Sequence, residues 1–185
     1  MGLNDTPSGE RIHIGFFGRR NAGKSRVVNA VTGQELAVVS DTKGTTTDPV
    51  SKAMELLPLG PVMIIDTPGF DDKGHLGELR VRKTKQILNR TDIAVLVIDA
   101  TEGIKQCEEE LLAIFKEKEI PYLLVYNKED ILSEEQKNLL RTEQSEQVNS
   151  ICVSALEKKH INELKEKLAR LVKTDSQKLQ LVGDL

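Results

Sequence analysis

The feature that most constrains the fold of this chain is a series of apolar segments, several of them continuous rather than alternating with polar residues. They lie at residues 11–17, 62–65, 93–98, 122–126 and 151–153. Continuous apolar segments of this length are typical of parallel strands that are covered on both faces. A further strand is predicted at residues 51–57, where the pattern is less regular.

Helical patterns lie between these segments. Two sets of apolar residues recur at helical spacing, namely Leu111, Leu112 and Phe115, and Ile161, Leu164, Leu168 and Leu171. Strands that alternate with helices predict an α/β fold on a mainly parallel sheet. The expected organisation is a flexible leader over residues 1–10, one domain over 11–173, and over 174–185 a tail or the start of a linker to a missing C-terminal part.

Length and composition exclude several classes of protein. The chain has 185 residues, of which 38% are hydrophobic and 30% charged, as in globular rather than disordered proteins. Its net charge of −3 disfavours nucleic acid as a partner, with binding through a local patch as the alternative. No apolar segment approaches the length of a membrane-spanning helix, so no membrane association is expected. Cys107 and Cys152 are too few for a disulfide framework or a metal cluster, which favours a reducing cytoplasm.

A glycine-rich loop follows the first predicted strand directly. Residues 18–25 read GRRNAGKS, which fits the phosphate-binding pattern G-x-x-x-x-G-K-S between a strand and a helix. In such a loop the main-chain N–H groups and the helix N-terminus face phosphate oxygens. Lys24 would neutralise the terminal phosphates and Ser25 would offer its hydroxyl to Mg²⁺. The residues of this segment that are predicted to bind the nucleotide are Asn21, Ala22, Gly23, Lys24, Ser25 and Arg26.

A second motif, Asp-Thr-Pro-Gly at residues 66–69, follows the strand at 62–65. Mg²⁺ prefers oxygen ligands in octahedral geometry and keeps several waters, so one carboxylate near the phosphates suits it. Asp66 is the predicted carboxylate. Gly69 would direct its main-chain N–H towards the terminal phosphate.

Two more motifs follow the last two predicted strands: Asn-Lys-Glu-Asp at 127–130 and Ser-Ala-Leu at 154–156. The ordered set of four motifs resembles the small GTPase domain. The resemblance implies a three-layer P-loop GTPase fold, with a mainly parallel six-stranded sheet and helices on both faces. It also implies that Asp130 reads the guanine base, so that GTP is preferred over ATP. The other residues that it assigns to the nucleotide are Asn127, Lys128, Ser154, Ala155 and Leu156.

The segment 41–49, with its Gly-Thr-Thr-Thr-Asp, resembles the first switch loop of the TrmE-Era-EngA group of GTPases. The resemblance assigns Thr46 to Mg²⁺ and to sensing of the terminal phosphate, with Thr45 as the alternative. Thr47 stands where members of the group carry arginine. This departure counts against a role in tRNA modification or ribosome assembly.

Phe70 occupies the position of the water-orienting glutamine of Ras-like proteins, and a phenyl ring cannot orient water. By resemblance to the same group, Asn21 would bind K⁺ beside the phosphates, and two G domains would form a transient homodimer through their switch regions. The resemblance also implies a water-positioning glutamate twelve residues after the motif aspartate, which is Glu78 in this sequence. Asp71 and Asp72 are the alternatives, and a solvated helix-start carboxylate is the structural alternative.

The P-loop, the switch segment and the run over residues 39–69 most resemble HydF, the family of iron-iron hydrogenase maturation GTPases. This resemblance implies a slow, potassium-stimulated, Mg²⁺-dependent GTPase domain of a maturation scaffold, with hydrogenase maturation partners and no metal cluster on this chain. One alternative is a TrmE/Era/EngA-type GTPase of tRNA modification or ribosome assembly. Another is a nucleotide-gated scaffold with negligible hydrolysis.

Several charged and sulfur-containing residues are expected to be structural. Arg19 and Arg20 are interpreted as a solvated loop tip, with contact to an anion or a partner beside the phosphates as the alternative. The acidic run 108–110 is interpreted as an exposed helix face. Cys107 is expected to be a surface thiol and Cys152 a buried strand residue.

Overall fold

The computed structural model describes residues 11–34, 48–70, 76–146 and 149–183. Helices and strands alternate along these residues, as the apolar pattern predicts. They are β1 (Ile12–Gly18), the short 3₁₀ helix η2 (Arg20–Ala22), α1 (Lys24–Thr32), β2 (Val50–Leu56), β3 (Gly60–Asp66), α2 (Glu78–Leu88), β4 (Ile93–Asp99), α3 (Gln106–Glu117), β5 (Tyr122–Asn127), the 3₁₀ helix η3 (Glu129–Ile131), α4 (Glu134–Glu146), β6 (Ser150–Cys152) and α5 (Ile161–Gly183).

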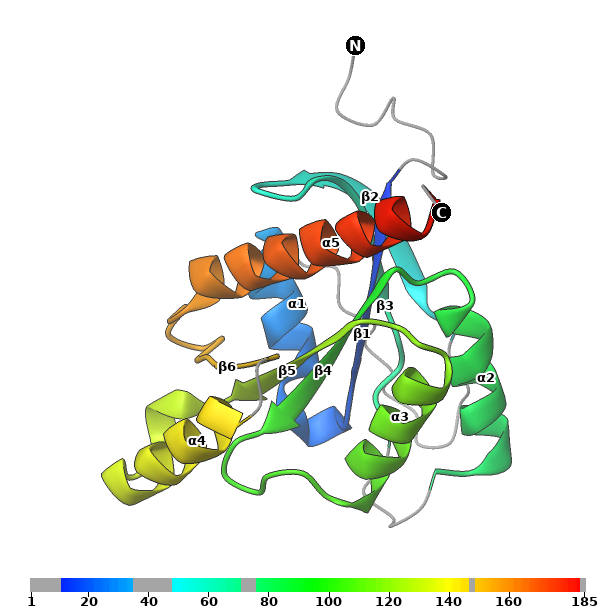
Figure 1. The fold of residues 1–185 in the computed structure, drawn as a ribbon. Helices are drawn as coiled ribbons and strands as arrows, with labels where there is room; N and C mark the ends of the chain where they lie inside the picture. The colour runs from blue at the N-terminus through cyan, green and yellow to red at the C-terminus, as the bar shows by residue number, and fades with distance from the viewer. Residues whose placement is uncertain (1–10, 35–47, 71–75, 147–148, 184–185) are drawn as a thin grey trace.

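The strands form one six-stranded sheet in the order β2-β3-β1-β4-β5-β6 (Figure 1). β2 is an edge strand and runs antiparallel to β3, because the two are joined by a short connection. The other neighbouring pairs are parallel. The carboxyl ends of β1, β3, β4 and β5 therefore lie along one edge of the sheet, where α/β proteins commonly bind their ligands.

Helices cover both faces of the sheet, so the molecule has three layers (Figure 1). One core packs α1 and α5 against the sheet, with Val28 and Leu164 fully buried. The other core packs α2, α3 and α4 against the opposite face. There the rings of Phe17 and Phe115 lie 5.3 Å apart between β1 and α3. The predicted three-layer fold with a mainly parallel six-stranded sheet is confirmed.

The C-terminal helix is longer than its sequence pattern predicts. α5 continues from Ile161 to Gly183, ten residues beyond the expected domain boundary at 173. Polar residues dilute the apolar stripe after Thr174, and the stripe was the signal used to set that boundary. In the described part of the chain, no helix combines the length and apolar character needed to cross a membrane.

Candidate functional site

The glycine loop lies at the carboxyl edge of the sheet, between β1 and α1. Gly23 ends η2 with φ +82°, a left-handed conformation that side chains disfavour. A Cβ atom at this position would also overlap Nδ2 of Asn127. The loop conformation therefore requires glycine here for two independent reasons.

Lys24 and Asp66 meet at the centre of this edge. Their side chains form a buried ion pair between Nζ and Oδ1, and 4% of Lys24 and 1% of Asp66 are exposed. Lys24 begins α1 and Asp66 ends β3, so two of the predicted motifs come together in space. A buried ammonium and a buried carboxylate at a strand end are suited to phosphate and to a hydrated divalent cation respectively.

Asn127 joins three loops. Its Nδ2 donates to the main-chain oxygen of Ala22 at 3.0 Å, and its Oδ1 accepts from the main-chain N–H of Ala155 at 3.0 Å. It is 3% exposed, so both hydrogen bonds are shielded from water. The phosphate loop, the 127–130 loop and the 154–156 loop are thereby held at fixed positions relative to one another.

Asp130 belongs to η3, next to the same junction. Its Oδ1 accepts a hydrogen bond from Oγ of Ser154 at 2.7 Å, which orients the carboxylate. Lys128 adopts a left-handed conformation with φ +74°, and its Nζ lies 2.8 Å from Oδ2 of Asp99.

A cavity of about 430 Å³ opens at this junction. It is lined by Arg20, Asn21, Gly23, Arg26, Asn127, Lys128, Asp130, Ile131 and Leu156. A volume of this size is within the usual range for small-molecule sites. Its lining comes from three of the four predicted motifs. Arg26 is exposed and borders the cavity together with the 127–130 loop, a position that its place in the P-loop helix did not indicate.

The remaining predicted residues differ in how closely they approach this site. Ser25 is half-buried at the start of α1, next to Lys24. Gly69 lies so close to the P-loop that an added Cβ would meet the backbone of Arg20. Glu78 is exposed in the first turn of α2. Thr46, like Thr45, Asp71 and Asp72, lies outside the described residues.

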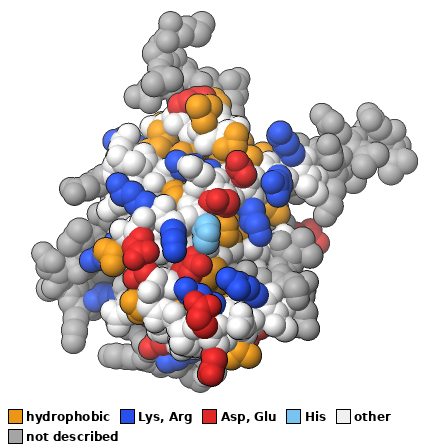
Figure 2. Space-filling view, turned by 90° about the vertical axis from the view of Figure 1, so that its left-hand side faces the viewer, with side chains coloured by type: hydrophobic (Ala, Val, Ile, Leu, Met, Phe, Trp, Pro, Cys, Tyr) orange, Lys and Arg blue, Asp and Glu red, His pale blue; other side chains and the backbone are white. Residues whose placement is uncertain are grey.

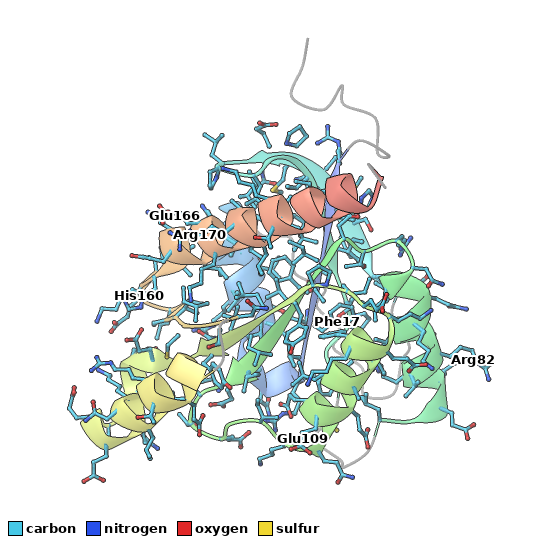
Figure 3. All side chains as sticks on the ribbon, viewed as in Figure 1. Phe17, Arg82, Glu109, His160, Glu166 and Arg170 are labelled. Carbon is cyan, nitrogen blue, oxygen red and sulfur yellow. The ribbon has the colours of Figure 1, made fainter. Side chains whose placement is uncertain are left out.

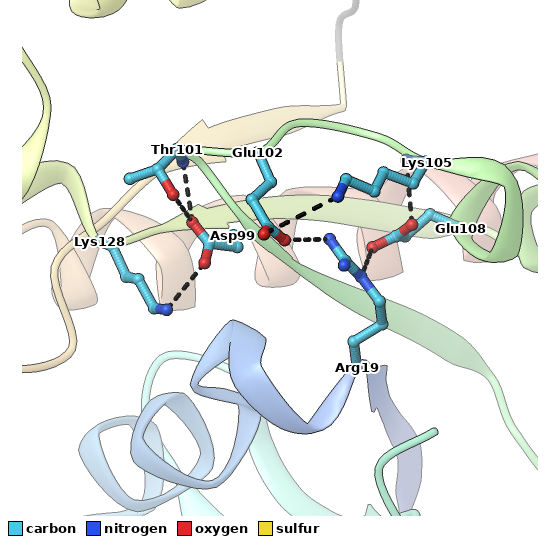
Figure 4. Close-up of polar contacts among 7 residues, drawn as sticks. All are labelled: Arg19, Asp99, Thr101, Glu102, Lys105, Glu108 and Lys128. Carbon is cyan, nitrogen blue, oxygen red and sulfur yellow. Dashed lines mark hydrogen bonds and ion pairs between the residues drawn. The ribbon is translucent and has the colours of Figure 1, made fainter. Parts of the chain in front are cut away.

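Two residues that sequence reasoning treated as solvated are buried beside the P-loop. Arg19 is 3% exposed and Glu108 is fully buried, and Nε of Arg19 donates to Oε1 of Glu108 at 2.5 Å (Figure 4). The predictions of a solvated loop tip at Arg19 and an exposed acidic face at Glu108 were therefore wrong. The two residues lie on different elements, and nothing in the local sequence of either indicates the pairing.

Asp99, at the end of β4, was also missed from the sequence. Burial raises its pKa, but hydrogen bonds from Lys128 and Thr101 outweigh that effect, and the net pKa lies below the ordinary value. Its position directly after a buried parallel strand was the available signal. Asp99 therefore stays ionised and holds Lys128 next to the cavity.

A P-loop, a strand-end aspartate and the 127–130 and 154–156 loops meet on one edge of a mainly parallel sheet. This combination defines a P-loop GTPase domain.

Known proteins resemble this chain in sequence and in fold. The family model described as "50S ribosome-binding GTPase" matches residues 13–128. The GTPase Der of Wolinella succinogenes is 32% identical over an alignment that covers 96% of this chain and 39% of that protein. The GTPase Der of Campylobacter concisus is 33% identical, over 92% of this chain and 38% of that protein. The chain thus spans about two fifths of the length of these curated relatives.

Solved structures with the same fold include Era of Aquifex aeolicus bound to GDP and AlF4⁻, with a TM-score of 0.68 and 26% identity over 86% of this chain and 56% of that one. An Era complex with MgGDPNP and a segment of 16S ribosomal RNA is 27% identical, with a TM-score of 0.68 and the same coverage. The G domain of the T. maritima FeoB iron transporter, at 23% identity and a TM-score of 0.63, shows the fold alone.

The chain belongs to the family of 50S ribosome-binding GTPases. The relatives named above include GTPases of the Era and Der type, which confirms the predicted GTPase domain. None of these named relatives is a hydrogenase maturation protein. One of these Era structures contains ribosomal RNA, so the comparisons do not support the expectation that nucleic acid is an unlikely partner.

Proposed function

We propose that this chain binds GTP together with Mg²⁺ at the carboxyl edge of the sheet and hydrolyses it to GDP and phosphate. The observation that carries the proposal is the junction at Asn127, which holds the phosphate loop and the base loop around one cavity. Motifs that lie far apart in the sequence therefore line one continuous surface that can take a nucleotide.

The residues present fit a triphosphate with its magnesium ion. On nucleotide binding, the Lys24 ammonium would leave its ion pair with Asp66 and contact the terminal phosphates instead. The Asp66 carboxylate and the Ser25 hydroxyl would then be available as direct or water-bridged oxygen ligands of the cation. Mg²⁺ supplies charge neutralisation at the phosphates when it is bound. Thr46 is proposed as a further ligand, and Gly69 as a main-chain donor to the terminal phosphate.

Recognition of guanine is proposed for Asp130. A carboxylate accepts from the two adjacent N–H groups on the guanine edge, and adenine lacks that pair of donors. The hydrogen bond from Ser154 at 2.7 Å supports this role, because it orients the carboxylate before any ligand binds. The exposed Ile131 and Leu156 beside it provide apolar surface for a base.

Water activation needs a group other than Phe70, which is 5% exposed and belongs to the core under α2 and α3. We propose K⁺ held by Asn21 and switch-loop carbonyls, with Glu78 as the water-positioning residue and a homodimer across the switches completing the site. Asn21 is exposed and lines the cavity, which supports its access to an ion beside the phosphates.

Multiple-turnover phosphate release in KCl and in NaCl tests this arrangement. Wild type is expected to turn over faster in KCl, and Asn21→Ala is expected to lose the difference. Equal rates in the two salts would remove the potassium proposal. Release of less than one phosphate per chain would instead favour the nucleotide-gated scaffold without hydrolysis.

In the cell, a role in ribosome assembly is the better supported proposal. It rests on the family match and on the Era complex with ribosomal RNA. The face in Figure 2 carries interspersed acidic and basic side chains rather than a uniformly basic surface. An RNA contact would therefore be local, and binding of ribosomal RNA that weakens with salt in a nucleotide-dependent way would support it.

A second candidate is the GTPase domain of a hydrogenase maturation scaffold in the cytoplasm. The specific observation in its favour is the resemblance of the sequence over residues 39–69 to the HydF family. Thr47 also stands where the resemblance to the TrmE-Era-EngA group leads us to expect arginine. Nucleotide-dependent association with hydrogenase maturation proteins, without affinity for ribosomal RNA, would favour this candidate.

A further inference from the structure

Arg19 connects the P-loop to the N-terminal end of α3. Its Nε donates to Oε1 of Glu108 at 2.5 Å, and its second terminal nitrogen lies 3.0 Å from Oε2 of Glu102 (Figure 4). Arg19 is 3% exposed and Glu108 is fully buried, whereas Glu102 is exposed. The guanidinium therefore extends from the loop through the protein interior to α3.

The two carboxylate oxygens of Glu108 accept hydrogen bonds from different partners. While Oε1 accepts from Arg19, Oε2 accepts from the main-chain N–H of Lys105 at 3.0 Å and so caps the first turn of α3. A carboxylate without solvent needs such partners, because an uncompensated buried charge is strongly destabilising. The start of α3 and the position of the Arg19 side chain are therefore set by the same group.

The backbone of Arg19 is held from the opposite side. It pairs with Phe70 in a parallel bridge, in which Arg20 N–H donates to the Phe70 oxygen at 3.2 Å and Phe70 N–H donates to the Gly18 oxygen at 3.3 Å. Phe70 directly follows the Asp-Thr-Pro-Gly motif. The first half of the P-loop is thus fixed by main-chain pairing on one side and by the Glu108 ion pair on the other.

Residues 99–108, from the last residue of β4 to the first turn of α3, also contact the 127–130 loop. Oδ2 of Asp99 lies 2.8 Å from Nζ of Lys128 (Figure 4). Further along α3, Oε2 of Glu110 accepts from the main-chain N–H of Leu76 at 2.7 Å. Residues 99–110 therefore touch the phosphate loop, the 127–130 loop and the chain that leads into α2.

We propose that Arg19 is a positioning residue for nucleotide binding, and that its buried ion pair with Glu108 makes the first turn of α3 a control point for nucleotide affinity. The pair holds the P-loop amides in the conformation that phosphate requires. A change at the N-terminal end of α3 alters the affinity for GDP and GTP without touching the nucleotide. This inference rests on the proposed function.

The test compares Glu108→Gln with Glu109→Gln. Both substitutions remove one negative charge from the same helix turn, but Glu109 is exposed on the outer surface (Figure 3). In Glu108→Gln the new amide oxygen can still accept from Lys105, so the cap of α3 is kept while the ionic contact to Arg19 is lost. Each variant is titrated with GDP and Mg²⁺ well below its melting temperature, and its thermal unfolding is recorded separately.

We expect Glu109→Gln to bind GDP within about twofold of wild type and Glu108→Gln to bind it about tenfold more weakly. A Glu108→Gln variant that melts earlier but binds GDP as tightly as Glu109→Gln would overturn the proposal and leave a purely structural ion pair. Wild type that binds no guanine nucleotide would instead contradict the proposed function.

Should Glu108→Gln not fold, Arg19→Lys carries the test. It keeps the positive charge but replaces the guanidinium, which reaches Glu108 and Glu102 through separate nitrogens, by a single ammonium. A several-fold loss of GDP affinity is expected. Affinity equal to that of wild type overturns the proposal.

Discussion

At the scale of single residues, two glycines with similar backbone conformations allow a matched comparison. Gly23 has φ +82° in the P-loop, and Gly33 has φ +70° at the end of α1. A Cβ at Gly23 would overlap the side chain of Asn127, whereas a Cβ at Gly33 meets no described atom within 4 Å. A side chain at either position would strain the backbone, but only a side chain at Gly23 would also overlap a neighbouring residue.

Gly33→Ala is expected to lower the free energy of unfolding by about 1–2 kcal/mol, the cost of a left-handed alanine, and to leave GDP binding unchanged. Gly23→Ala is expected to cost more and to weaken GDP binding, because Asn127 must move from between the loops. Urea unfolding and GDP titration measure the two effects. Equal behaviour of the two variants would contradict the role given to Asn127.

Cys152 provides a pH-dependent prediction. Burial, together with the nearby Glu129 carboxylate, raises the pKa of its thiol to about 11. Only the thiolate is nucleophilic, so at pH 8 about one thiol in a thousand is reactive, far fewer than for an ordinary cysteine. Alkylation should be slow in the native protein and should accelerate about tenfold per pH unit up to about pH 10.

Cys107 should react still less, because it is 2% exposed. In denaturant both thiols should react at the rate of unfolded cysteine. Rapid labelling of the native protein at pH 8, with a rate that barely changes with pH, would contradict the raised pKa of the Cys152 thiol.

Burial was the property that the sequence indicated least well for single residues. Cys107 was expected on the surface, but it is buried. It lies four residues before the buried Leu111 on the same helix face, so helical spacing could have predicted its burial. Arg19 and Glu108 differ, because their burial depends on a partner 89 residues away. No local pattern reports such a pairing, whereas the motif residues Lys24 and Asp66 could be located from spacing alone.

At the scale of elements, β4 occupies the middle of the sheet and has no exposed residue. Its alternate residues face different cores: Val95 packs with α1 and α5, and Leu96 packs with α2 and α3. This two-sided burial explains why the segment reads as a continuous apolar run, and why removal of side-chain volume here affects stability directly.

Leu96→Ala is expected to lower the free energy of unfolding by about 2–5 kcal/mol, because it leaves a cavity in a fully buried layer. Leu139→Ala removes the same atoms from a residue that is 66% exposed and should change stability by less than about 0.5 kcal/mol. Chemical denaturation of both variants measures this contrast. Similar losses would argue against the packing of β4.

Elements buried on both sides were predictable from the sequence, and polar elements were not. Each parallel strand lies within about two residues of its apolar segment, because two-sided burial leaves a strong signal. α4 (Glu134–Glu146) was not anticipated, since it is rich in polar residues and contributes Leu140 to the core. The last turns of α5 were assigned to a tail for the same reason.

At the scale of the whole molecule, the order of the strands determines the site. Adjacent parallel strands β3, β1, β4 and β5 end at one edge, so motifs separated by more than 100 residues meet there. The positions of the four motifs could be predicted because this order is common to the resembled fold. Partners and cellular role were less accessible, because they depend on surfaces and on regions of the relatives that this chain does not span.

The most direct test of nucleotide recognition is a calorimetric titration of wild type and Asp130→Asn with GDP, ADP and xanthosine diphosphate in the presence of Mg²⁺. Wild type is predicted to prefer GDP over ADP by about 10⁴ or more. Asp130→Asn should lose GDP affinity and gain affinity for xanthosine diphosphate, because an amide can donate to the carbonyl that replaces the guanine amino group. Absence of Mg²⁺-dependent GDP binding, or a preference of wild type for ADP, would contradict the account.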